Sequence, residues 1–230
     1  MPFSAEKNLF SRSPELEQES FFIEQYKKLL SKNISQGYYE NDQEMLIDFK
    51  TKAEGEINFL KDVLTRANMA QKENPGKECV ILFDLDETLV KAFFDENDEL
   101  KQYTRPCLPI LLDSLEKNKM KIGLLTSRRM VQEQIQETGE LGLLGKYCNS
   151  NYIYSTRDYL ELQREQSLIK DPRIINRPEL QTTGNLEKIA FFDDLIADNP
   201  KKVFVPIDDF EYPKLYQYGL ALSDKQKFNL

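Results

Sequence analysis

Two acidic side chains stand directly after an apolar stretch of the chain. Asp84 and Asp86 follow residues 79–83, a run of Cys, Val, Ile, Leu and Phe that is typical of a strand buried on both faces. Carboxylates at the end of a buried strand are costly unless positive charge balances them. Mg²⁺ is a natural counter-ion, because it prefers hard oxygen ligands. An isolated Asp-x-Asp is more often a solvated turn, but the strand before this pair and Thr88 after it favour a functional site.

A second acidic group follows a later apolar run. Asp193, Asp194 and Asp198 come after residues 189–192, which are Ile, Ala, Phe and Phe. A solvated loop would also explain these acids. Two carboxylate clusters at the ends of buried strands nevertheless suggest a metal ion held between them. The sequence therefore predicts a metal centre that draws on both clusters.

A hydroxyl group ends a third apolar run. Thr126 follows residues 121–125, and Ser127, Arg128 and Arg129 come next. A hydroxyl at a strand end, together with backbone N–H groups at the start of a helix, can bind a phosphate oxygen. Thr and Ser are also common in turns and helix caps. The two arginines are as compatible with an exposed helix surface as with contact to a substrate.

The composition excludes several kinds of chemistry. The 230 residues contain no His, so a Ser–His–Asp or Cys–His pair and a His-ligated zinc are impossible. Acid–base work must come from carboxylates, Lys, Tyr or Cys. The 31 Lys and Arg against 39 Asp and Glu give a net charge of −8. This balance lacks the basic footprint of a general nucleic-acid binder, so we expect no nucleic-acid partner.

Several features bear on the compartment. Cys79, Cys107 and Cys148 form no close pair and are interpreted as reduced thiols in a cytoplasmic protein. No stretch approaches 18 consecutive apolar residues, so we expect no membrane span. The start of the sequence lacks a basic region followed by an apolar one, which predicts no signal peptide. Export by a non-classical route stays open, and the oligomeric state is not specified.

Two regions of different pattern make up the chain. Residues 1–75 read as helical: a cap at Ser13 precedes one helix, and apolar residues three and four apart from Leu46 to Ala67 predict a second. From residue 76 apolar runs alternate with helical patterns, which predicts an α/β domain over 76–230 with a Rossmann-like parallel sheet and helices on both faces. Strands are expected at 79–83, 121–125, 152–154, 189–192 and 203–205, and helices at 109–118, 130–139 and 157–166.

These motifs carry a family resemblance that spans about residues 78–210. The run from Val80 to Val90 resembles the first motif of haloacid dehalogenase (HAD) superfamily phosphatases, and Thr126 resembles the second. Asp193 and Asp194 with Asp198 are similar to the fourth. The third motif is a Lys upstream of the fourth. Lys170 is similar in context to the Lys of the small, capless phosphoprotein phosphatases of the C-terminal-domain type, although Arg164, Arg173 and Arg177 compete for this role.

The resemblance implies a mechanism. Asp84 would attack phosphorus and form an aspartyl-phosphate, and Asp86 would act as general acid and base. Mg²⁺ would be held by Asp84, by the backbone carbonyl of Asp86 and by Asp194. The phosphoryl oxygens would be neutralised by Thr126 and Lys170. Asp193 and Asp198 would support the metal ligands.

The spacing of the motifs bears on the substrate. Only 37 residues separate Thr88 from Thr126, room for a short flap at 93–103 but not for a large cap. By resemblance to capless members, we expect an open site and a phosphorylated protein substrate, with phospho-Tyr and phospho-Ser/Thr undecided. The alternatives are a phosphatase of nucleotides or small phosphometabolites and a non-catalytic binding module. The N-terminal helices are interpreted as scaffold behind the sheet, and the alternative is a substitute cap over the site, which would favour smaller substrates.

Overall fold

The computed structural model describes residues 14–33, 42–94, 100–128, 142–157 and 185–228. The helices expected at 130–139 and, apart from Arg157, at 157–166 lie outside these residues. Lys170 also lies outside them. Within the described part of the chain, no helix is both long and apolar enough to cross a membrane.

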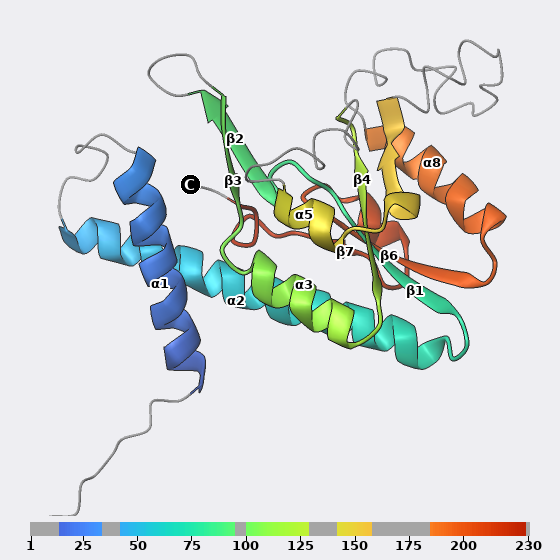
Figure 1. The fold of residues 1–230 in the computed structure, drawn as a ribbon, viewed down its shortest axis with the longest axis horizontal. Helices are drawn as coiled ribbons and strands as arrows, with labels where there is room; N and C mark the ends of the chain where they lie inside the picture. The colour runs from blue at the N-terminus through green and yellow to red at the C-terminus, as the bar shows by residue number, and fades with distance from the viewer. Residues whose placement is uncertain (1–13, 34–41, 95–99, 129–141, 158–184, 229–230) are drawn as a thin grey trace, which may run out of the picture.

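A five-stranded parallel sheet lies at the centre of the fold, in the order β5-β4-β1-β6-β7 (Figure 1). The middle strand β1 pairs with β4 on one side and β6 on the other, so that Phe83 lies opposite both Leu124 and Ile207. The strands expected near residues 79, 121, 152 and 203 are confirmed. Their bounds are β1 Glu78–Phe83, β4 Lys121–Thr126, β5 Ile153–Ser155, β6 Lys202–Asp208 and β7 Leu220–Ala221.

The strand expected at residues 189–192 is wrong. These residues lie within the helix α8, Asn185–Asp198. A short apolar run cannot be distinguished from one face of a buried helix by periodicity alone. Here Ala190 and Phe192 are buried, whereas the next two residues, Asp193 and Asp194, are exposed, as expected for a helix packed on one side.

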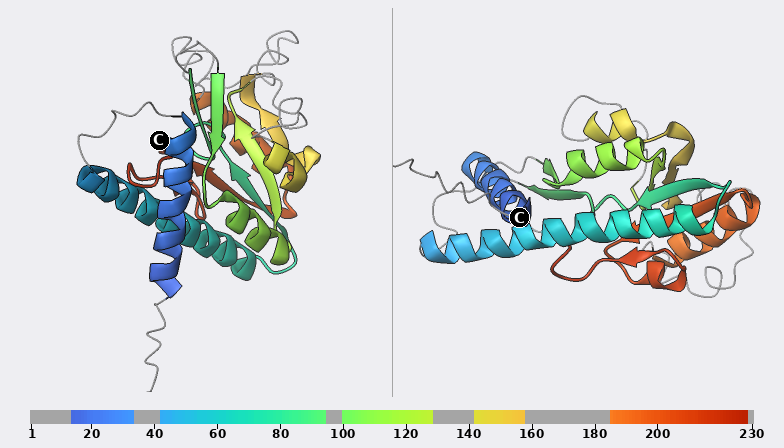
Figure 2. Two further views of the ribbon diagram at one scale, coloured as in Figure 1. Left: turned by 60° about the vertical axis from the view of Figure 1, so that its left-hand side comes forward. Right: turned by 90° about the horizontal axis from the view of Figure 1, so that it is seen from below.

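Helices cover both faces of the sheet, which is therefore the middle of three layers (Figure 2). α2 (Asp42–Glu73), α3 (Leu108–Lys117) and α5 (Gly142–Tyr147) lie on one face, and α8 lies on the other. The strand β1 serves both cores because its side chains alternate. Ile81 and Phe83 pack with the α2 side, whereas Val80 and Leu82 pack with Phe192 of α8.

The long helix α2 belongs to the sheet's own core. Phe59, Val63, Ala67 and Ala70 are fully buried, and they share one cluster with side chains of β1 and β6. The shorter helix α1, Pro14–Asn33, crosses α2 and packs against it (Figure 1). This arrangement supports the interpretation of α2 as scaffold.

An antiparallel hairpin projects beyond the sheet between β1 and α3 (Figure 1). Its strands are β2, Val90–Phe94, and β3, Leu100–Thr104. It occupies the part of the sequence where a short flap is expected. Two short 3₁₀ turns, Ser150–Tyr152 and Tyr212–Leu215, complete the described elements.

A buried polar cluster fixes the base of this hairpin. One carboxylate oxygen of Glu56, on α2, accepts a hydrogen bond from the Tyr26 hydroxyl at 3.0 Å and lies 3.3 Å from Nε of Arg105. Its other oxygen accepts from the backbone N–H of Cys107 at 3.0 Å. Arg105 also donates to the carbonyl oxygen of Gln226. The cluster joins both N-terminal helices to the hairpin and to the last described segment.

The close approach of α2 to this segment leads to a first prediction. A Cβ added at Gly55 would lie 2.2 Å from the carbonyl oxygen of Lys225. Gly→Ala inside an open helix stabilises by up to about 1 kcal/mol. Here we expect Gly55→Ala to lower the free energy of unfolding by about 1–3 kcal/mol, because two backbones must separate. Denaturant unfolding measures the change.

The neighbouring residue Glu54 is exposed on the same helix and provides the control. Glu54→Ala should change the free energy of unfolding by no more than about 0.5 kcal/mol. A stabilising Gly55→Ala would contradict the close approach of α2 to residue 225.

Candidate functional site

Asp84 lies at the carboxyl end of the central strand β1. Its backbone N–H donates to the carbonyl oxygen of Ile207 at 2.8 Å, which continues the pairing with β6 beyond the last strand residue. The side chain is only 5% exposed. A carboxylate so deeply buried requires compensating charge or hydrogen bonds.

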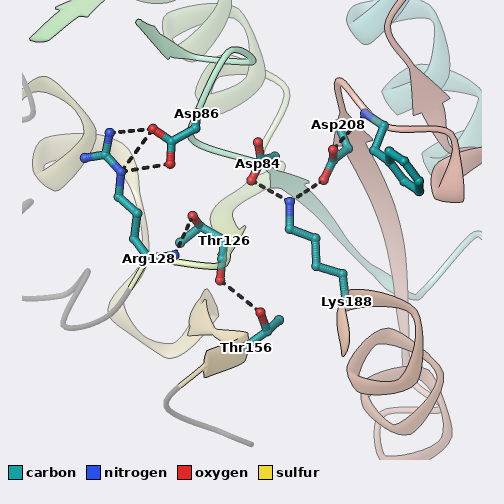
Figure 3. Close-up of polar contacts among 8 residues, drawn as sticks. Asp84, Asp86, Thr126, Arg128, Thr156, Lys188 and Asp208 are labelled. Carbon is teal, nitrogen blue, oxygen red and sulfur yellow. Dashed lines mark hydrogen bonds and ion pairs between the residues drawn. The ribbon is translucent and has the colours of Figure 1, made fainter. Parts of the chain in front are cut away.

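Lys188 supplies that charge from the opposite layer. It lies near the start of α8, and its ammonium is 2.7 Å from Oδ1 of Asp84 and 2.7 Å from Oδ2 of Asp208 (Figure 3). All three side chains are buried. The ammonium therefore bridges the ends of two adjacent strands, β1 and β6, from a helix that covers one face of the sheet.

Asp208 and Asp209 bring two further carboxylates to the same place. Asp208 is the last residue of β6, and its Oδ1 accepts a hydrogen bond from the N–H of Phe210 at 2.9 Å. One oxygen each of Asp84, Asp208 and Asp209 lies within 4.8 Å of the others. Three carboxylates face one ammonium, so negative charge is in excess when all of them are ionised. The donor set fits a hard divalent cation as a class.

The buried environment shifts the acidity of these groups. Burial raises the pKa of Asp84 to about 7, with Asp208 adding to the rise and Lys188 opposing it. Burial and the charge of Asp208 raise the pKa of Asp209 to about 6. Burial lowers the pKa of Lys188, but the attraction of Asp84 and Asp208 raises it by more, above its usual value. Lys188 is therefore a permanent cation at neutral pH.

Thr126 lies beside this group at the end of β4, the other neighbour of β1. It is buried, and its hydroxyl oxygen accepts a hydrogen bond from the N–H of Arg128 at 3.2 Å. The Thr156 hydroxyl donates to the carbonyl oxygen of Thr126 at 3.4 Å (Figure 3). These contacts fix the turn that follows β4 and place its hydroxyl at the same edge as Asp84.

Asp86 faces the opposite direction from Lys188 and pairs with Arg128 (Figure 3). The guanidinium donates to both carboxylate oxygens, through Nε to Oδ2 at 2.9 Å and through Nη2 to Oδ1 at 2.5 Å. A third donor, Nη1, reaches Oε1 of Gln102 on β3 at 2.7 Å. The hairpin therefore takes part in the site.

The structure brings together only some of the residues expected from the sequence. Asp84, Asp86 and Thr126 meet at one edge of the sheet, as predicted. Asp193, Asp194 and Asp198 instead lie exposed on α8. Asp193 accepts a hydrogen bond from Tyr216 at 2.7 Å.

The described residues contain no metal-binding group that includes Asp194. The carboxylates found beside Asp84 are Asp208 and Asp209. The expected placement of the second acidic cluster is therefore corrected, because it depended on a strand at 189–192 where the chain forms a helix.

The sequence itself indicates the position of the carboxylates found beside Asp84, namely Asp208 and Asp209. Residues 203–207 form an apolar run with β-branched Val203, Val205 and Ile207, and Asp208 and Asp209 follow it directly. β-branched residues favour strands over helices. The earlier run at 189–192 has Ala and two Phe, which fit a helix face equally well. Lys188 had no such signal, because nothing in the sequence places a helical Lys against a strand end.

The buried bridge leads to a second prediction. Lys188→Met leaves Asp84 and Asp208 buried without their shared cation, so it should lower the free energy of unfolding by about 3–5 kcal/mol at pH 8 in EDTA. At pH 5 the loss should be smaller, because the unpaired carboxylates can take up protons. Denaturant titrations at both pH values measure the change.

Lys214 provides a matched control with the same ion-pair distance. Its ammonium is 2.7 Å from Glu211, but both side chains are largely exposed. Lys214→Met should leave stability close to that of the unmodified protein. A similar loss in the two variants would mean that Lys188 does not bridge buried charges.

The raised pKa values lead to a third prediction. Asp84 and Asp209 bind protons more tightly in the folded chain, so their contribution to stability is full at about pH 4 and is lost as pH rises towards 7. Protons and a cation compete for the same oxygens. MgCl₂ should therefore raise the melting temperature more at pH 8 than at pH 5. At a hundredfold excess over the dissociation constant the stabilisation is about 2.7 kcal/mol.

Thermal unfolding with MgCl₂ and with NaCl of equal ionic strength tests this expectation. Asp209→Asn should reduce the effect of MgCl₂. An equal shift by both salts, or an equal shift at both pH values, would contradict a carboxylate-bound cation.

Comparisons with known proteins add little to this geometry. No protein-family model and no curated protein match the chain. Among solved structures, a hypothetical protein from Xanthomonas campestris is similar at 13% sequence identity and a TM-score of 0.30, over 70% of this chain and 75% of that chain. The proposed roles of Asp84, Lys188 and Asp208 therefore rest on their positions in the fold and on the motifs of this sequence.

Proposed function

We propose that the protein is a phosphomonoester hydrolase that requires a divalent cation, with Mg²⁺ as the cation used, and that Asp84 is its nucleophile. The observation that carries the proposal is the meeting of Asp84 with Lys188 and two further carboxylates at the ends of β1 and β6. The resemblance of the Asp84–Thr88 segment to the first HAD motif supports the same reading.

Each residue has a role in two displacement steps. An Asp84 oxygen attacks phosphorus, the bond to the leaving oxygen breaks, and Asp86 gives its proton to that oxygen. The product is an aspartyl-phosphate. Water then attacks the same phosphorus and gives a proton to Asp86, which releases inorganic phosphate and restores Asp84.

Positive charge and hydroxyl groups stabilise the phosphoryl oxygens during both steps. Lys188 is already fixed beside Asp84 at 2.7 Å, so we assign it the role that the sequence suggested for Lys170. Thr126 donates from the adjacent strand end. Lys188 already faces two carboxylates, Asp84 and Asp208. A cation bound to these carboxylates would neutralise their charge and leave that of Lys188 available to the substrate.

Asp84, Asp208 and Asp209 would hold the metal, with the backbone carbonyl of Asp86 as a further ligand. Mg²⁺ bound there would neutralise the charge that develops on the phosphoryl oxygens. The chain's contribution is to hold these oxygen donors at one strand edge. Asp208 is fixed by Lys188 and by the N–H of Phe210.

Exposure at the entrance supports a large substrate. The Asp86 side chain is 47% exposed, and the described insertion between β1 and β4 is a two-stranded hairpin followed by α3. The helix α2 packs under the sheet rather than over this edge. A phosphorylated protein side chain is therefore our proposed substrate. The three free thiols fit a reducing compartment such as the cytoplasm.

The fourth prediction tests the reaction. Hydrolysis of p-nitrophenyl phosphate should require MgCl₂, stop with EDTA and fall about a thousandfold or more in Asp84→Asn, because that variant lacks the nucleophile. Asp209→Asn should show weakened activation by MgCl₂.

Asp194→Asn distinguishes the two acidic clusters and serves as the matched variant. It should keep most of the activity, because Asp194 lies exposed on α8. Loss of activity in this variant would restore the sequence-based metal assignment. A folded protein that binds Mg²⁺ and shows no turnover would instead favour a binding module.

A further inference from the structure

The guanidinium of Arg128 occupies the whole carboxylate of Asp86. Nε lies 3.1 Å from Oδ1 and 2.9 Å from Oδ2, and Nη2 lies 2.5 Å from Oδ1. Nη1 donates to Gln102 at 2.7 Å. Both acceptor oxygens of Asp86 and most donors of Arg128 are therefore engaged (Figure 3).

This arrangement conflicts with the work proposed for Asp86. To give a proton to a leaving oxygen, Asp86 needs one oxygen free to hold that proton and to face the substrate. Both oxygens instead accept hydrogen bonds from the guanidinium, so neither is free to face a substrate. If Asp86 is the general acid, the pair must open during the reaction, and this step rests on the proposed function.

The position of Arg128 indicates what could open the pair. Its backbone N–H donates to the hydroxyl oxygen of Thr126, so the residue begins at the proposed phosphate site. Figure 3 draws Asp86 between Arg128 and Asp84. A phosphoryl group at Asp84 would thus arrive beside the carboxylate that the guanidinium holds. Arginine presents planar paired donors that match phosphate as well as carboxylate.

The ion pair of Arg128 and Asp86 is also exposed enough for Arg128 to change its partner. The Asp86 side chain is 47% exposed and the Arg128 side chain 18% exposed. Such an ion pair is weak compared with a buried one, because water competes with both partners. A phosphomonoester carries two negative charges against the single charge of Asp86. Gln102 is neutral and can hold Nη1 in either state.

We propose that Arg128 is a phosphate-binding residue that exchanges Asp86 for phosphoryl oxygens when a phosphomonoester enters the site. In the free protein it holds Asp86 on the hairpin side. When the substrate binds, the guanidinium turns to the phosphoryl group, and Asp86 is released to face the leaving oxygen. General-acid function thereby becomes available only when a phosphoryl group is present.

The test is a double-mutant cycle on the binding of inorganic phosphate, measured by titration calorimetry in MgCl₂ with the full chain. Arg128→Gln should weaken binding tenfold or more, since a charge-assisted bidentate contact is lost. Asp86→Asn should tighten binding about tenfold, because the competing carboxylate is gone. In the Arg128→Gln background, Asp86→Asn should no longer increase the affinity for phosphate.

Two results would overturn the exchange. If Asp86→Asn tightens binding equally in the Arg128→Gln background, Asp86 only repels phosphate by its charge. If Arg128→Gln leaves phosphate binding unchanged, Arg128 is a structural partner of Asp86. Should Arg128→Gln not fold, Arg128→Lys provides a second variant. This variant keeps the positive charge but lacks the paired donors. It should weaken phosphate binding several-fold and reduce the increase in affinity caused by Asp86→Asn.

Arg157 provides a control for loss of charge near the same edge. It is exposed and follows Thr156, just after β5. Arg157→Gln should change phosphate binding less than twofold. The calorimetric cycle needs no turnover, so it separates the two proposals. Absence of Asp84-dependent hydrolysis would refute the proposed function, whereas failure of the cycle would refute the role of Arg128 alone.

Discussion

The bridge from Lys188 to Asp84 and Asp208 is the interaction on which the arrangement of side chains at the carboxyl edge of the sheet depends. It joins three elements that are remote in sequence: the central strand β1, its neighbour β6 and the helix α8 of the outer layer. Each carboxylate is buried and would be costly alone, and the ammonium would be equally costly without both. The charges are thus acceptable only when the three elements are correctly assembled.

The remaining architecture supplies rigidity around this bridge. Two apolar cores enclose β1, one from α2 and α3 and one from α8, so the strand that carries Asp84 has little freedom to shift. Thr126 is fixed in the same way on β4. Asp86 and Arg128 differ, because they are partly exposed and contact the projecting hairpin through Gln102. The site therefore combines a rigid half at Asp84 with a half-exposed part at Asp86.

Much of this organisation could be predicted from the sequence, and the exceptions have a physical cause. Continuous apolar runs ending in polar residues predicted β1 and β4, and therefore the positions of Asp84, Asp86 and Thr126 at or just after their ends. The strand predicted at 189–192 is wrong because Ala190 and Phe192 suit a helix as well as a strand. The second acidic cluster was therefore expected at Asp193 and Asp194, whereas the carboxylates beside Asp84 are Asp208 and Asp209. The contact of Lys188 with Asp84 could not be predicted from the sequence, since it depends on how a helix packs across the sheet.

The polar cluster around Glu56 has a consequence for synthesis of the chain. Arg105 donates to the carbonyl of Gln226, and the N–H of Phe228 donates to the carbonyl of Glu87 at 2.8 Å. Glu87 and Arg105 are thus synthesised more than a hundred residues before the partners that bind them. On the ribosome, the loop after Asp84 and the hairpin base emerge with their carbonyl and guanidinium groups still hydrated. The contacts at the hairpin base and in the loop after Asp84 cannot form until this late segment has left the exit tunnel.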